Sequence, residues 1–202
     1  EDEELVGLGP DGRVDRKALT DRLNGAANVA CVVVQSPNFF GVVEDVKPLA
    51  DLAHAHGALL VVVNTEPVAY GVLQSPGALG ADIAVGNSQR FGVPMGFGGP
   101  HAAFIATSEA YVRKLPGRII GVSRDSHGNR ALRMAIQTRE QHIRRDKATS
   151  NICTNSGLCA LAFTIHMTLL GGAGAETVTK LVANAEWQKW WVKNSALFAT
   201  SQ

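Results

Sequence analysis

Several features are scarce in this 202-residue sequence, and each shortage argues against a class of protein. Three cysteines are an odd number in a chain long enough to bury a core, which argues against a secreted disulfide framework and favours the cytoplasm. Uninterrupted apolar runs reach only about six residues, well below the roughly 20 that cross a bilayer. Nineteen Lys and Arg against 18 Asp and Glu leave a net charge of +1, so the whole chain shows no electrostatic preference for nucleic acid or an anionic membrane.

Hydrophobic patterning predicts one α/β domain. Residues 28–35 and 58–64 are continuous β-branched runs typical of strands buried on both faces, and residues 43–56 between them carry apolar side chains at helical spacing. Together they predict a βαβ unit with a parallel sheet. Further expected elements are helices at 15–24, 109–114, 157–170 and 176–191, strands at 82–85 and 101–106, and a hairpin of 119–122 with 131–136.

A short strand that leads into a glycine-rich loop, GADIAVGNSQRFGVPMGFGGP at residues 80–100, is where we expect chemistry. Ligands of open α/β sheets lie beyond the carboxyl ends of the strands, and glycine leaves the backbone there uncovered. Gly96, Gly98 and Gly99 lie in this loop. They suit a phosphate-cradle shape and equally a tight passage of the chain between strands.

Four stretches of the sequence resemble the glycine decarboxylase P-protein family of the glycine cleavage system: VVVQSPNFFGVVED, GADIAVGNSQRFGVPMGFGGPHAAFIA, LPGRIIGVSRD and TREQHIRRDKATSNICTN. They occur in the family's order, and the resemblance extends over residues 28–172. It implies an aminotransferase-like (PLP fold type I) large domain with a mostly parallel sheet and flanking helices, truncated and therefore a fragment. We accordingly expect residues 1–172 to be a partial large domain and residues 173–202, which depart from the family, to be a C-terminal helical tail.

The resemblance also implies a function divided between two halves. The family decarboxylates glycine on pyridoxal phosphate and passes the aminomethyl group to the lipoyl domain of the H-protein, and only one half carries the lysine that forms the internal aldimine. This chain resembles the amino-terminal, lysine-less half. We therefore expect an oligomer with the lysine-bearing half, no cofactor held covalently by this chain and no decarboxylase activity from it alone.

Two positions set this sequence apart from the lysine-bearing half of the family. Arg90 falls at the lysine position, and Asn64 falls at the position of the Asp that pairs with the pyridinium nitrogen. A guanidinium stays protonated and is no nucleophile, and an amide lacks the negative charge that keeps the ring nitrogen protonated. No lysine occurs between Lys47 and Lys114, so a small shift of the alignment does not restore one. The other interpretation of Arg90 is a surface or interface arginine in an ion pair.

The basic run TREQHIRRDKATSNICTN is a second candidate site. If its first half is helical, Arg139, His142 and Arg145 lie near one face, and with Arg144 they would suit a phosphate or carboxylate, or a wall of the partner half's pocket. Neutral hydrogen-bonding residues beside them are Thr149, Ser150, Asn151 and Thr154. A solvated helix with acidic partners explains the same residues.

Other functions also stay open at this point. One is a non-enzymatic binding or scaffold protein that reuses the fold, and another is an independent α/β enzyme that uses His142 with nearby acids. No metal site is predicted, because His54 and His56 lie two residues apart on a predicted helix and face different ways.

Overall fold

The computed structural model describes residues 3–96, 100–137, 144–148 and 156–182, and the chain divides into two compact units. Unit 1 comprises Glu1–Ala106 with Leu158–Gln202, and unit 2 comprises Thr107–Gly157. The expected boundary between residues 172 and 173 stays a prediction.

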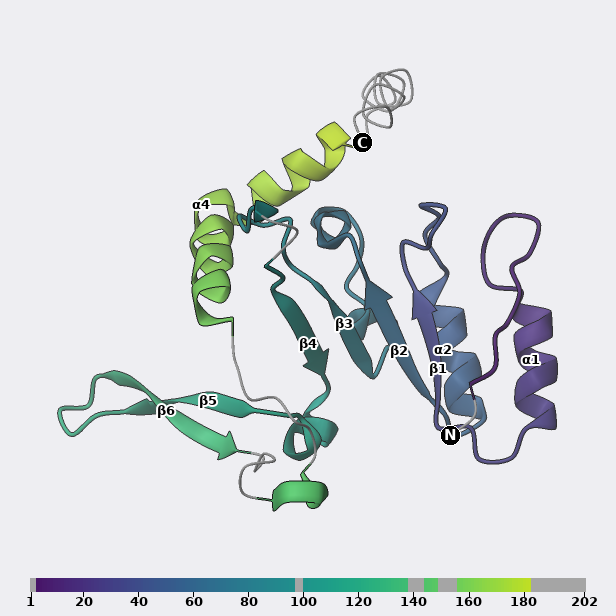
Figure 1. The fold of residues 1–202 in the computed structure, drawn as a ribbon, viewed down its shortest axis with the longest axis horizontal. Coiled ribbons are helices and arrows are strands. Elements are labelled where there is room, and N and C mark those ends of the chain that lie inside the picture. Colours follow the sequence, from purple (N-terminus) through teal and green to yellow (C-terminus); the bar gives the residue numbers. More distant parts are fainter. Residues whose placement is uncertain (1–2, 97–99, 138–143, 149–155, 183–202) are drawn as a thin grey trace. The chain divides into compact units, whose positions relative to one another are not determined.

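Unit 1 is built on a four-stranded sheet in the order β1-β2-β3-β4. Its strands are β1 (Cys31–Gln35), β2 (Leu59–Asn64), β3 (Ile83–Asn87) and β4 (Ala103–Thr107). β2 pairs in parallel with β1 and with β3, so that Val61 lies between Val33 and Ile83. β4 runs opposite to β1 and β2 (Figure 1). The predicted parallel βαβ unit and mostly parallel sheet are therefore confirmed.

Two helices form the core of unit 1 with the strands. α1 (Arg16–Gly25) is capped by Asp15, whose Oδ1 accepts hydrogen bonds from the N–H groups of Lys17 and Ala18 at 2.9 and 3.1 Å. α2 (Val46–Ala55) ends before Gly57, whose φ of 73° turns the chain into β2. The buried apolar residues that join the helices to the strands are Leu19, Leu23, Val34, Val46, Leu49, Ala50, Ala53, Ala58, Leu60 and Val62.

The expectation of strands buried on both faces is wrong for this chain taken by itself. Burial alternates along β2, where Leu60, Val62 and Asn64 are buried and the residues between them are half-buried. Val33 of β1 is 60% exposed. A continuous apolar run indicates a sheet covered on both faces, and the described residues supply such a layer on one face only.

Unit 2 contains an antiparallel hairpin formed by β5 (Arg118–Arg124) and β6 (Arg130–Gln137), which confirms the predicted hairpin with longer strands. In its turn, Oδ1 of Asp125 accepts hydrogen bonds from the N–H groups of His127 and Asn129 at 2.8 and 2.9 Å. Gly128 adopts a φ of 83°, which glycine does without strain. The turn is therefore fixed by its own residues.

Short 3-10 helices also occur among the described residues. They are η1 (Pro67–Gly71), η2 (Gly77–Leu79), η4 (Glu109–Lys114) and η5 (Arg145–Lys147). The helix expected at 109–114 forms as a 3-10 helix, and the side chain of Ser108 before it makes no capping hydrogen bond. Without that cap, a helix of this length has little to hold it in the α form.

The apolar helix predicted at 157–170 is the first part of α4 (Gly157–Val182). By length and composition, residues 157–174 could cross a membrane. The short apolar runs of the sequence did not predict this. Core helices of soluble proteins also pass the same test of length and composition. Gly171, with φ 63° and ψ 176°, interrupts the helix, and Figure 1 shows the bend. Residues 157–170 are then a straight segment about 21 Å long, shorter than the roughly 30 Å of a bilayer's hydrocarbon core.

Candidate functional site

The end of β2 and the loop after β3 meet at the carboxyl edge of the parallel strands. The register places Asn64, the last residue of β2, opposite Gly86 of β3. An open pocket of about 610 Å³ lies at this edge, lined by Thr65, Asn87, Gln89, Arg90, Gly92, Val93, Pro94 and Met95. This is the edge at which the sequence predicts chemistry.

Arg90 is the charged residue in the lining of this pocket, and it is paired. Its Nη2 lies 3.1 Å from Oε2 of Glu66, two residues beyond the end of β2. The side chains of Arg90 and Glu66 are 68% and 39% exposed, so water screens the pair. The ion pair expected of a surface or interface arginine is present, and the guanidinium is turned to a carboxylate of its own chain.

Asn64 is almost completely buried, with 1% of its surface exposed. Its Nδ2 donates a hydrogen bond to the backbone carbonyl of Ser36 at 3.1 Å, and its Oδ1 is buried without a hydrogen-bond partner. Burial raises the pKa of the nearby Tyr70 phenol, and the Asn64 amide partly lowers it. The amide therefore joins the ends of β1 and β2 and leaves one polar atom unsatisfied.

Hydrogen bonds close the base of the glycine-rich loop. The N–H of Ser88 donates to the carbonyl of Ala102 at 2.7 Å, and the Gln89 amide donates to the carbonyl of Pro100 at 2.8 Å. The Asn87 side chain bonds the His101 ring at 2.9 Å. These hydrogen bonds hold residues 87–89 and residues 100–102, the two ends of the loop, together.

Helix α4 packs on the start of the same loop. The ring of Phe91 lies 5.9 Å from that of Phe163 and 6.2 Å from that of His166, measured between centroids. Gly92 has a φ of 83°, and a Cβ there would lie 2.7 Å from the Cβ of His166. Glycine at this position therefore permits both the turn and the close approach of α4.

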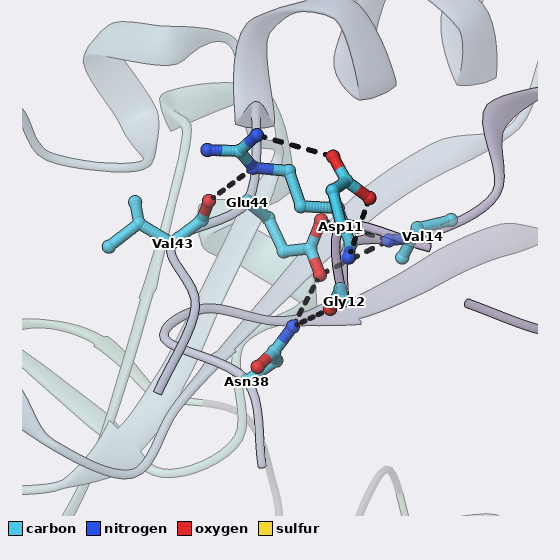
Figure 2. Close-up of polar contacts among 7 residues, drawn as sticks. Asp11, Gly12, Val14, Asn38, Val43 and Glu44 are labelled. Atoms are coloured by element: carbon cyan, nitrogen blue, oxygen red, sulfur yellow. Dashed lines mark hydrogen bonds and ion pairs between the residues drawn. The ribbon is translucent and has the colours of Figure 1, made fainter. Parts of the chain in front are cut away.

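The loop after β1 is held by a separate polar network. Nδ2 of Asn38 donates to the Gly12 carbonyl at 2.7 Å and to Oε1 of Glu44 at 2.9 Å, and both Glu44 oxygens accept from the N–H of Val14 (Figure 2). Arg13 Nε donates to the Val43 carbonyl at 2.9 Å. The buried carboxylate thereby ties residues 12–14 to the loop, which is a structural role.

The resemblance seen in the sequence implies pyridoxal phosphate, and Arg90 and Asn64 at this edge do not fit it. Position 90 offers a guanidinium already paired with Glu66, and no lysine occurs in the sequence between Lys47 and Lys114. Position 64 offers an uncharged amide, which donates a hydrogen bond to a backbone carbonyl. Without a primary amine at position 90 and a carboxylate at position 64, these two positions lack the groups on which the chemistry depends.

The described site residues fall in both units. Arg90 and Asn64 lie at the same edge of the sheet in unit 1, and Arg144 and Arg145 are exposed residues of unit 2. A Cβ at Gly96 would meet nothing within 4 Å, so close packing does not require glycine there. The predictions that lie outside the described residues are those for Gly98, Gly99, Arg139, His142, Thr149, Ser150, Asn151 and Thr154.

Glu66 is the residue of this edge that sequence reasoning missed. It follows a predicted strand by two positions, and a lone acidic residue in a loop gives no signal of its partner. His54 and His56 have separate partners: His54 Nε2 lies 2.8 Å from Oδ2 of Asp82, and His56 bonds Leu52 and Asn24. Among the described residues, no group of three or more His, Cys, Asp or Glu side chains is arranged to hold a metal.

Comparison with known proteins gives consistent matches. The family model described as "Glycine cleavage system P-protein" matches residues 12–197. The chain is 57% identical over 155 residues to the probable glycine dehydrogenase (decarboxylating) subunit 1 of Phenylobacterium zucineum, covering 77% of this chain and 35% of that protein. It is 59% identical over 147 residues to the protein of the same name from Caulobacter vibrioides, covering 73% and 33%. The chain thus spans about a third of the length of the curated relatives it matches.

Solved structures agree. A crystal structure of glycine decarboxylase (P-protein) of the glycine cleavage system, in inhibitor-bound form, is 52% identical with a TM-score of 0.69, covering 74% of this chain and 34% of that one. The apo cysteine desulfurase of Thermococcus onnurineus is 19% identical with a TM-score of 0.52, covering 85% and 39%, and shows the fold alone. The predicted aminotransferase-like PLP fold type I is confirmed.

Proposed function

Because the chain belongs to the glycine cleavage system P-protein family, we propose that it is a piece of the lysine-less half of glycine decarboxylase. The whole enzyme would decarboxylate glycine on pyridoxal phosphate and pass the aminomethyl group to the lipoyl arm of the H-protein. The name "subunit 1" of the relatives supports a second subunit, which we take to be the lysine-bearing half. This chain's own contribution is structural, in association with that half and in shaping its pocket.

One observation supports this assignment: the guanidinium of Arg90, at the position that the resemblance gives to the catalytic lysine, pairs with Glu66. An amine that attacks an aldehyde must lose its proton, and a guanidinium does not. The same pocket edge carries Asn64, which contributes no charge. We therefore assign both the decarboxylation and the binding of pyridoxal phosphate to the lysine-bearing half.

The basic run belongs to this proposal as a wall of the partner's pocket. Arg144 and Arg145 are exposed, which suits contact with an anionic group of either a ligand or a partner surface. No observation favours a free-standing scaffold or an independent enzyme that uses His142.

The test is reconstitution with carboxyl-labelled glycine. We expect no release of labelled carbon dioxide from the purified chain with pyridoxal phosphate, and a complex on size-exclusion chromatography when the lysine-bearing half is added. The lysine-bearing half alone and a heat-denatured sample of the chain are the controls. Decarboxylation by the chain alone, or failure to form a complex with the lysine-bearing half, would overturn the assignment.

A further inference from the structure

The pocket at the carboxyl edge of the parallel strands has both polar and apolar lining residues. Its volume of about 610 Å³ lies in the range of sites that hold small molecules. The polar lining consists of Thr65, Asn87, Gln89 and Arg90, and the apolar lining is the run of Val93, Pro94 and Met95. A molecule that suits this lining carries one polar or charged group and a short hydrocarbon part.

Two of the polar lining residues are engaged in holding the glycine-rich loop. The Asn87 side chain bonds the His101 ring, and its Oδ1 accepts hydrogen bonds from the N–H groups of Gln89 and Ala102 at 3.0 and 3.4 Å. Nε2 of Gln89 donates to the carbonyl of Pro100 at 2.8 Å. A ligand would have to break these hydrogen bonds to use either amide group fully.

The other two polar lining residues keep hydrogen-bond donors for a ligand. A guanidinium has five N–H donors, and the ion pair printed for Arg90 among the described residues uses Nη2, which lies 3.1 Å from Oε2 of Glu66. Oγ1 of Thr65 accepts a long hydrogen bond of 3.4 Å from Nε2 of Gln35, which leaves its own O–H to donate. Arg90 and Thr65 can therefore both donate to one anionic group.

The contact with Glu66 indicates which anionic group suits Arg90. A guanidinium is a planar fork that matches the two oxygens of a carboxylate, and Arg90 already pairs with a carboxylate of its own chain. The lining itself contains no acidic residue. Because the two side chains are 68% and 39% exposed, water screens the pair, and a carboxylate from solution can compete with Glu66.

We propose that this pocket is a reversible, noncovalent binding site for a small carboxylate with a short apolar chain. The carboxylate accepts hydrogen bonds from Arg90 and Thr65 in competition with Glu66, and the hydrocarbon part lies on the apolar lining of residues 93–95. This goes beyond the proposed function, because it assigns the lysine-less half a ligand of its own. A phosphate is the poorer occupant, since it brings a charge of about −1.5 to −2 to a single cation that has Glu66 beside it.

The test is a titration of the ¹⁵N-labelled chain with butyrate, monitored by the amide chemical shifts of Gln89, Arg90 and Gly92. We expect saturable binding with a dissociation constant in the millimolar range, as is usual for so small a ligand. Butyramide, which has the same shape without the charge, should bind at least about 10-fold more weakly. Acetate, which lacks two methylene groups, should bind about 5-fold more weakly.

Two substitutions test the roles of the ion pair. Arg90→Gln should weaken butyrate binding at least about 10-fold and leave the weak binding of butyramide unchanged, because only the charged ligand needs the guanidinium. Glu66→Gln should strengthen butyrate binding about 3-fold, because it removes a weak competitor for Arg90.

The chain offers a matched control in the ion pair of Arg22 and Glu4. Nη1 of Arg22 lies 3.1 Å from Oε2 of Glu4, and the two side chains are 64% and 62% exposed, but neither residue lines the pocket. Arg22→Gln and Glu4→Gln remove the same charges and should bind butyrate like the unaltered chain. Circular dichroism checks that each variant folds.

Several results would overturn the inference. They are the absence of saturable shifts up to about 100 mM butyrate, well above the expected millimolar range, equal affinity for butyrate and butyramide, equal affinity for butyrate and inorganic phosphate, and unchanged butyrate binding by Arg90→Gln. If Arg90→Gln does not fold, Glu66→Gln still decides, because weaker binding by that variant would contradict competition. The lysine-bearing half takes no part in these titrations, so their failure leaves the proposed function standing, and failure of the reconstitution leaves this inference standing.

Discussion

Arg90 and Glu66 form an ion pair between the loop after β3 and the segment after β2, with Nη2 and Oε2 3.1 Å apart. The pair joins two chain segments that are 24 positions apart in the sequence and bound the same pocket. The pair also engages the guanidinium of Arg90, which lines the pocket. A ligand that binds Arg90 would therefore compete with the carboxylate of Glu66.

The Arg90–Glu66 pair is expected to add little stability, because both side chains are partly solvated. A double-mutant cycle with Arg90→Gln and Glu66→Gln, followed by urea denaturation, should give a coupling free energy below about 1 kcal/mol. A coupling of several kcal/mol would mean that the pair is buried in solution and has a structural role larger than the one assigned here.

Asn64→Asp tests whether this edge accepts a negative charge. The site is buried, and Asn64 contacts the Ser36 carbonyl and no cation, so we expect the free energy of unfolding at pH 7 to fall by about 3 kcal/mol. Burial would raise the pKa of the introduced carboxyl group, so the loss should shrink as the pH is lowered and the group becomes neutral.

The control for this substitution is Asn64→Leu, which loses the hydrogen bond to Ser36 at every pH. Its destabilisation should therefore not vary with pH. An Asn64→Asp protein as stable at pH 7 as the unaltered chain would show that a compensating cation lies nearby in solution.

Asp82 makes a stability contribution that depends on pH. Burial alone would raise the pKa of this carboxyl group, but hydrogen bonds from His54 and from the N–H of Leu60, together with the His54 charge, lower the pKa below its usual 3.8. A lowered pKa stabilises the fold above the unfolded value, and this contribution is lost as the pH falls through the folded value.

Asp82→Ala should therefore cost about 1–2 kcal/mol of unfolding free energy at pH 7, because the Leu60 N–H loses an acceptor. Between the unfolded and folded pKa values of this group, the stability of the variant should depend less steeply on pH than that of the unaltered chain. Denaturant titrations from pH 2.5 to 7 check both points. If the unfolding free energies of the two proteins fell equally steeply as the pH was lowered, the assignment would be contradicted.

Gly86 is expected to tolerate no side chain. A Cβ at this position in β3 would press on the Asn64 carbonyl oxygen and on the ring of Phe104. Gly86→Ala should lower the free energy of unfolding by about 2–3 kcal/mol, since backbone of β2 or β3 must move. Gly77→Ala is the control: a Cβ there meets nothing within 4 Å, and its effect in the same thermal melt should stay within about 0.5 kcal/mol.

Much of unit 1 follows from patterns within single segments. The helix predicted at 15–24 forms as α1 with Asp15 as its cap, and the apolar runs at 28–35 and 58–64 predicted the strands around α2, because capping and burial of a run are local properties. The runs did not predict the half-exposed Val33, since the layer that covers a second sheet face comes from elsewhere. The helix predicted at 109–114 forms, but its 3-10 geometry was not predicted, and the side chain of Ser108 before it makes no capping hydrogen bond.

The candidate site was predictable only in part, for a related reason. Arg90 and Asn64 were identified from the resemblance, and the sheet places both at one edge. Glu66 was not identified, because an ion pair between residues 24 positions apart depends on how β2 and β3 lie side by side.

The most direct test of the central claim is chemical. The purified chain is mixed with pyridoxal phosphate and reduced with borohydride, and its peptides are mapped by mass spectrometry beside those of the lysine-bearing half treated in the same way. We predict a single fully modified lysine in the lysine-bearing half and no site of stoichiometric modification in this chain. One lysine of this chain modified in full, with an absorbance band that the reduction removes, would contradict the account.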